Sequence, residues 1–154
     1  MKNFLNYLFG LFFLIFFNCN YKNSSEYLEF FYIEPNVSTP YSYPCNMISE
    51  EILGESINYK KIDDKQQFKK IMNLYNQYEI TNDSTGINTR IKILIHSQLK
   101  TDTLCLGEYF NTYKNGVKMK DNQQLLKYTK EIIDYENTIP AFVKKHPEQF
   151  NLKK

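Results

Sequence analysis

Arginine is almost missing from this chain of 154 residues. Arg90 is the only arginine among 19 basic Lys and Arg residues, and the formal net charge is +2 at pH 7. Bidentate recognition of phosphates and base edges depends on arginine, and nucleic-acid binding needs basic residues gathered on one face. Here the lysines are scattered along the sequence. We therefore expect no nucleic-acid partner.

Glycine and histidine are also scarce. The five glycines form no G-x-G pattern, which excludes the glycine-rich turns that cradle phosphates. The two histidines, His96 and His146, lie in different segments with no metal-ligand spacing around them, and no G-x-S-x-G pattern occurs. A metal site needs three or four convergent ligands, and nucleophilic catalysis needs a Ser or Cys beside a base. The sequence therefore predicts no metal, no cofactor and no catalytic residues, and we expect a protein that is not an enzyme.

Tryptophan is absent and Ala141 is the only alanine, whereas Phe, Tyr, Asn, Lys and Ile make up nearly half of the chain. All five favoured residues have A/T-rich codons, which indicates a low-GC genome rather than a function. The 12 Phe and 13 Tyr residues are therefore explained by mutational bias and core packing rather than by a ligand site.

The N-terminus carries an apolar run that is too short to span a bilayer. Lys2 gives a positive start, and the run from Phe4 to Phe17 falls short of the roughly 18–20 residues that a membrane-spanning helix needs. The polar stretch NCNYKNSSE follows directly. Residues 1–18 are therefore predicted to be a signal peptide. No A-x-A site is evident, although Ser24 and Ser25 are small enough for conventional cleavage and secretion.

The order of a basic start, a Phe/Leu/Ile run, Cys19 and then Asn, Ser and Lys resembles bacterial lipoprotein signals, most of all the loose ones of Bacteroidota. The usual pattern has leucine where Phe16 stands and a small residue where Asn18 stands. The resemblance implies that Cys19 becomes the first mature residue and carries the lipid. It also implies a location in the cell envelope, anchored to a membrane and facing an oxidising compartment.

The remaining two cysteines, Cys45 and Cys105, then form an even pair in an oxidising compartment. A disulfide between them would close a loop of about 60 residues, which the chain-entropy model values at roughly 4 kcal/mol. The alternative is two small buried thiols, because spacing alone does not tell whether the two side chains meet.

Residues 19–26 are predicted to be a tether, and residues 27–154 a single domain. Its first half contains an aromatic strand over 27–34, expected to be buried on both faces, and a weaker strand over 56–62. A helix over 64–78 follows, capped by Asp63 or Asp64, with apolar residues at 3–4 spacing. The polar stretch 81–86 fits a turn better than a calcium loop, which would bring more carboxylates.

The second half predicts strands over 89–96 and 103–110, and Leu104, Leu106 and Phe110 share one face of the latter. Asn115-Gly116 is a strong hairpin signal, and a helix capped by Asp121 ends near Asn137. Two strands, a helix, three strands and a helix indicate an α+β fold: an antiparallel sheet of about five strands joined by short turns, with two main helices on one face.

Residues 102–133 resemble the hairpin-and-helix ending of small uncharacterised lipoproteins from the same bacteria, a likeness that supports the location and the fold class only. We expect a membrane-anchored binding or structural domain, with Tyr41 and Tyr43 as candidate contacts for a protein partner. The alternatives are an immunity or inhibitor protein that blocks an enzyme or toxin, and a secreted protein with a conventionally cleaved leader.

Overall fold

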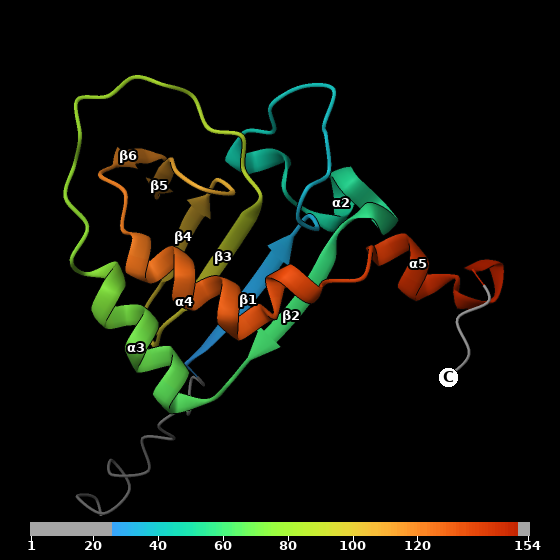
Figure 1. Ribbon diagram of the computed structural model, residues 1–154. Helices are drawn as coiled ribbons and strands as arrows, with labels where there is room; N and C mark the ends of the chain where they lie inside the picture. The colour runs from blue at the N-terminus through green and yellow to red at the C-terminus, as the bar shows by residue number, and fades with distance from the viewer. Residues whose placement is uncertain (1–25, 151–154) are drawn as a thin grey trace, which may run out of the picture.

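The computed structural model describes residues 26–150, so the predicted signal peptide, Cys19 and most of the tether lie outside it. Six strands form one antiparallel sheet, and two helices, α3 (Lys65–Tyr75) and α4 (Gln123–Ile133), lie across one of its faces (Figure 1). This arrangement confirms the predicted α+β class.

The strands follow the chain in a nearly sequential order across the sheet, β2-β1-β3-β4-β5-β6. They are β1 (Tyr27–Tyr32), β2 (Asn58–Ile62), β3 (Ile91–His96), β4 (Thr101–Leu106), β5 (Thr112–Lys114) and β6 (Val117–Met119). Because β2 and β3 are both antiparallel to β1, they run in the same direction on either side of it. The connection through α3 is therefore a crossover, not the short turn that we expected.

The described residues also form four α-helices: α2 (Glu50–Leu53), α3 (Lys65–Tyr75), α4 (Gln123–Ile133) and α5 (Ala141–Lys145). Asp64 caps α3 as predicted, since its carboxylate accepts the N–H of Gln67 at 2.8 Å. The cap of α4 is Asn122, not Asp121, because the Asn122 side chain accepts the N–H of Leu125 at 3.0 Å. In the part of the chain that the structure describes, no helix is long and apolar enough to span a membrane.

The main core lies between the sheet and helices α3 and α4. Alternate residues of the central strands point into it, among them Leu28, Phe30, Ile93 and Leu104, all fully buried. The strand β1 is therefore buried on one face only, and the prediction of two buried faces was wrong. Its aromatic run reflects residue usage more than burial, because every second side chain of β1 remains partly exposed.

The sheet has six strands rather than five because both sides of the Asn115-Gly116 turn pair as strands. The two turn residues have φ of 48° and 80°, the left-handed conformation that this dipeptide tolerates. The strand β4 ends at Leu106 instead of continuing to residue 110. Phe110, which we expected beside Leu106 in the core, is 62% exposed.

The register of the strands gives the sheet two distinct ends. At the proximal end, where β1 begins, Tyr27 lies opposite His96, and His96 lies opposite Thr101. At the distal end, Tyr32 and Leu106 both lie opposite Ile91. Figure 1 shows β1 starting at the lower edge of the sheet, and the longest loops gathered at its upper edge.

Cys45 and Cys105 are joined by a disulfide, with their Cα atoms 5.7 Å apart across 60 residues. Cys105 is fully buried and lies next in β4 to the inward-facing Leu104 and Leu106, so it points to the face that the helices leave open. The disulfide fastens the connection 33–57 across the distal part of this face. Such a bond is consistent with an oxidising compartment.

Candidate functional site

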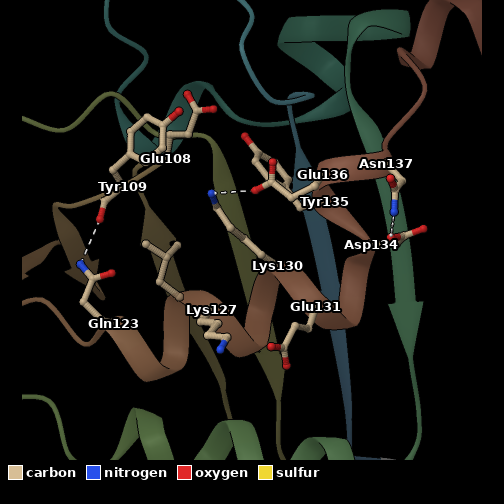
Figure 2. A pocket seen from close by; sticks show the side chains of 11 residues that line it. Glu108, Tyr109, Gln123, Lys127, Lys130, Glu131, Asp134, Tyr135, Glu136 and Asn137 are labelled. Carbon is tan, nitrogen blue, oxygen red and sulfur yellow. Dashed lines mark hydrogen bonds and ion pairs between the residues drawn. The ribbon is translucent and has the colours of Figure 1, made fainter.

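A cleft of about 560 Å³ lies at the distal end, between the β4–β5 loop and one side of α4 (Figure 2). Its volume is in the range that proteins use to hold small ligands or side chains of a partner. The lining is formed by the loop, α4 and the turn that follows α4: Glu108, Tyr109, Gln123, Leu126, Lys127, Lys130, Glu131, Asp134, Tyr135, Glu136 and Asn137.

One wall of the cleft is the tight loop between β4 and β5, residues 107–111. The N–H of Gly107 donates to the carbonyl of Asn111 at 2.9 Å, and Asn111 adopts a φ of 71°. A Cβ atom at Gly107 would collide with the carbonyl oxygen of Phe110, so this position requires glycine. The tight turn leaves Tyr109 59% exposed beside the cleft.

The opposite wall forms where α4 ends. Asp134 takes the left-handed conformation with a φ of 56°, which stops the helix and turns the chain back as a 3-10 turn, Tyr135–Asn137. The ring of Tyr135 is fully buried under this turn. The helix was expected to continue to Asn137, and it ends at Ile133 because Asp134 accepts a conformation that favours a C-cap.

Lys130 is the central charged group of the cleft. Its ammonium bonds the carboxylate of Glu136 at 3.1 Å and lies 4.9 Å and 5.1 Å from the ring centres of Tyr135 and Tyr109. The Lys130 side chain is only 17% exposed, whereas that of Glu136 is 65% exposed. The cleft therefore holds a cation between two aromatic rings and a carboxylate that is open to solvent.

The base of the distal loops contains Arg90, the only arginine. Its Nη2 donates to the carbonyl of Val37 at 2.8 Å, and its Nε lies 3.9 Å from the carboxylate of Glu108. Arg90 is 6% exposed, and its Nη1 has no hydrogen-bond partner within residues 26–150. The arginine thus joins the connection 33–57 to the loop that walls the cleft.

The hydroxyl of Tyr135 is buried and, among the residues that the structure describes, has no hydrogen-bond partner. Burial raises the pKa of this phenol, Glu108 raises it further, and Arg90 opposes the change. The phenol therefore stays protonated and neutral at physiological pH. This donor is buried in the part of the cleft wall that Tyr135 forms.

His96, the last residue of β3, lies on the open face of the sheet at the proximal end. Its Nε2 is 2.7 Å from a carboxylate oxygen of Glu29, its Nδ1 is 3.0 Å from the Thr101 hydroxyl, and its ring stacks on Tyr27 at 4.1 Å. Glu29 is 67 residues away in the sequence, and no sequence pattern indicated this pairing. His146 is placed 3.0 Å from Glu55, also outside the cleft.

Tyr41 and Tyr43 lie in the connection 33–57, also at the distal end. Tyr41 is 59% exposed and packs edge-on against Tyr43 at 5.1 Å. The backbone of Tyr43 is bonded on both sides: its N–H donates to Asn88 at 3.0 Å, and its carbonyl accepts the N–H of Thr89 at 2.8 Å. The two tyrosines share an end of the molecule with the cleft but do not line it.

The polar stretch 81–86 is a loop held by a lysine. The buried ammonium of Lys118 donates to the carbonyl and the hydroxyl of Thr85, at 3.0 Å each, and to the side chain of Asn111. Asp83 accepts the N–H of Thr85, and this bond lowers the pKa of the carboxyl. An ammonium thus occupies the centre of the oxygen cluster where a calcium ion could be imagined from the sequence.

Within residues 26–150, no three His, Cys, Asp or Glu side chains come together in the manner of a metal site. The sequence did not predict the cleft. Its walls come from segments about 20 residues apart, and one of these segments, 107–110, was predicted to be part of a strand. Gly107, with Tyr109 and Phe110 two and three residues later, was the available signal. Comparisons of this chain with protein-family models, with curated proteins and with solved structures find no match.

Proposed function

We propose that this chain is a lipoprotein of the bacterial cell envelope, anchored by a lipid on Cys19, whose domain binds a protein partner in the distal cleft and catalyses no reaction. The observation that carries the proposal is the position of the cleft. It opens at the end of the sheet opposite to the point where the chain enters β1. A domain held by its N-terminus would present this end to a partner.

The chemistry of the cleft supports a protein partner. Tyr109 and the neighbouring Phe110 are both more than half exposed, although large apolar side chains are usually buried. Aromatic residues beside a pocket are typical of the residues that contribute most to protein–protein binding. The exposed carboxylate of Glu136 and the largely buried Lys130 supply polar contacts for orientation.

The Cys45–Cys105 disulfide supports the envelope location, because such bonds persist in oxidising compartments. The lipid on Cys19 is supported by the likeness of residues 1–20 to lipoprotein signals. Replacing Cys19 with Ser should release the protein from the membrane fraction. A Cys19→Ser variant that stays bound to membranes would contradict the anchor.

Photo-crosslinking in intact cells tests the cleft. A photoreactive amino acid in place of Tyr109 should give one discrete protein adduct, and the same group in place of Asp63, exposed at the proximal end, should not give it. Lys130→Glu should abolish the adduct, whereas Lys145→Glu, a charge reversal outside the cleft, should leave it intact. Equal adducts from both sites, or no adduct at Tyr109, would contradict binding in the cleft.

An inhibitor or immunity protein is the second candidate, and the rigid 107–111 loop favours it. A loop fixed by Gly107 loses little conformational entropy when Tyr109 and Phe110 insert into a partner's site. If the crosslinked partner is an enzyme or a toxin, the purified chain should lower its activity at a one-to-one ratio. An unchanged activity would leave simple binding as the function.

A further inference from the structure

The turn between β3 and β4, residues 97–100, carries a solvent-exposed leucine at the proximal end of the sheet. Leu99 is 97% exposed. The turn is closed by Ser97, whose N–H and hydroxyl both bond the carbonyl of Lys100 at 2.9 Å, so Leu99 lies at its tip. Tight turns favour Gly, Asn, Asp and Ser at such places. A leucine here has no role in closing the turn or in filling the core.

The same end of the sheet receives the chain from the predicted tether. Tyr27, the first residue of β1, lies opposite His96, which directly precedes the turn. From Cys19 to Glu26 there are eight residues, and a chain of that length reaches at most about 28 Å. A lipid on Cys19 would therefore keep the tip of this turn close to the bilayer surface.

We infer that the β3–β4 turn is a second membrane contact, in which Leu99 enters the lipid surface while the Cys19 anchor holds the chain there. The inference rests on the proposed anchor. A single exposed leucine carries no meaning by itself, but this one is almost completely exposed, and it lies at the end of the sheet where the chain enters from the anchor.

The neighbouring charges suit a lipid–water boundary. Lys100 is 66% exposed with its ammonium bonded to Asp102, and Lys61 and Lys65 are exposed at the same end. Lysines at a lipid–water boundary can keep their ammonium groups among the headgroups. Asp63 and Asp64 lie beside them and nearly balance the charge. The contact therefore depends on the Leu99 side chain rather than on attraction to anionic lipids. The membrane contact therefore orients the domain so that the distal cleft faces away from the bilayer.

Tryptophan fluorescence tests this contact, because the chain has no tryptophan of its own. Two variants of the full lipidated chain, Leu99→Trp and Tyr41→Trp, each carry one reporter at an exposed position, at the proximal and the distal end respectively. Both are reconstituted in vesicles of zwitterionic phospholipid with and without brominated acyl chains. Retention of the disulfide in each variant verifies the fold.

We expect brominated lipid to quench the emission of the Leu99→Trp variant at least twofold and to leave the emission of the Tyr41→Trp variant unchanged, at low and at high salt. Equal quenching of the two variants on vesicles that retain the protein would overturn the membrane contact and leave the anchor standing. If the chain does not stay on the vesicles at all, the anchor fails, and the inference fails with it.

Discussion

The two ends of the sheet differ in how the chain turns around. At the proximal end the connections are short: Asp63 and Asp64 lead into α3, and four residues join β3 to β4. At the distal end the connections 33–57, 76–90 and 107–111 are long or strained, and the only disulfide among residues 26–150 fastens one of them. Binding residues concentrate on long loops that a rigid scaffold positions. Under the proposed function, we therefore expect the distal end to contact the partner and the proximal end to lie near the anchor.

The two ends are also stabilised by different means. At the distal end, connections with few core residues are fixed by a covalent bond, by the buried Arg90 and by a glycine that allows a close approach. At the proximal end, Asp102 is buried and bonds Lys100 at 3.1 Å and Asn115 at 2.9 Å, which joins two neighbouring turns. Substitutions at the two ends should therefore have different signatures.

The largest expected effect comes from the disulfide. Replacing both Cys45 and Cys105 with Ser should lower the free energy of unfolding by about 4 kcal/mol, because the bond closes a loop of about 60 residues. Denaturant unfolding with and without a reducing agent measures this value. The double variant should show no response to the reducing agent, and an equal stability of wild-type protein in both conditions would contradict a formed disulfide.

Gly107→Ala should cost about 2 kcal/mol, within the range for overpacking a site that cannot relax freely. The reason is the collision of the new Cβ with the Phe110 carbonyl. Gly86→Ala is the matched control, because a Cβ there meets no atom within 4 Å and should leave stability unchanged. Equal unfolding midpoints for the two variants would show that the distal loop is not tight.

Asp102→Asn should cost about 1–3 kcal/mol at pH 7, since hydrogen bonds to a charged group are lost. Burial acts to raise the pKa of Asp102, but the bonds from Lys100 and Asn115 outweigh it, and the pKa in the folded protein is lowered. The contribution of Asp102 to the free energy of unfolding is therefore complete above the unfolded pKa of about 4. This contribution is lost as the pH falls below that value. Unfolding curves should converge for wild type and variant in acid; a constant difference at all pH values would contradict this.

Tyr109→Ala should have the smallest effect on stability, within about 0.5 kcal/mol, as is usual for exposed side chains. The same substitution should nevertheless remove partner binding. This pair of measurements separates a binding residue from a structural one. A large loss of stability would place Tyr109 among the residues that hold the fold.

Local signals in the sequence predicted the elements that depend on near neighbours. The Asn115-Gly116 turn and the Asp64 cap need only adjacent residues, and both occur as expected. The strand over 103–110 was wrong beyond Leu106, because the requirement for Gly107 arises from the Phe110 carbonyl folded against it. Alternating apolar residues give no sign of such a contact.

Contacts between residues far apart in the sequence could not be predicted, for the same reason. Glu29 and His96 are 67 residues apart and meet only because β1 and β3 are neighbours in the sheet. Arg90 was recognised as the only arginine, but its contacts with Val37 and Glu108 depend on how the distal loops pack. A sequence pattern can predict which side chains share a face of a helix or strand. It does not predict which residues of another element those side chains contact.

The most direct test of the account is the mass of the mature protein isolated from its native membrane. We predict an N-terminus at Cys19 that bears diacylglycerol, together with a mass lower by two hydrogens for the Cys45–Cys105 disulfide. This result would show that the chain is held at the membrane by its N-terminus, from the side on which it enters β1. An intact Met1, or cleavage at another position without lipid, would contradict the account.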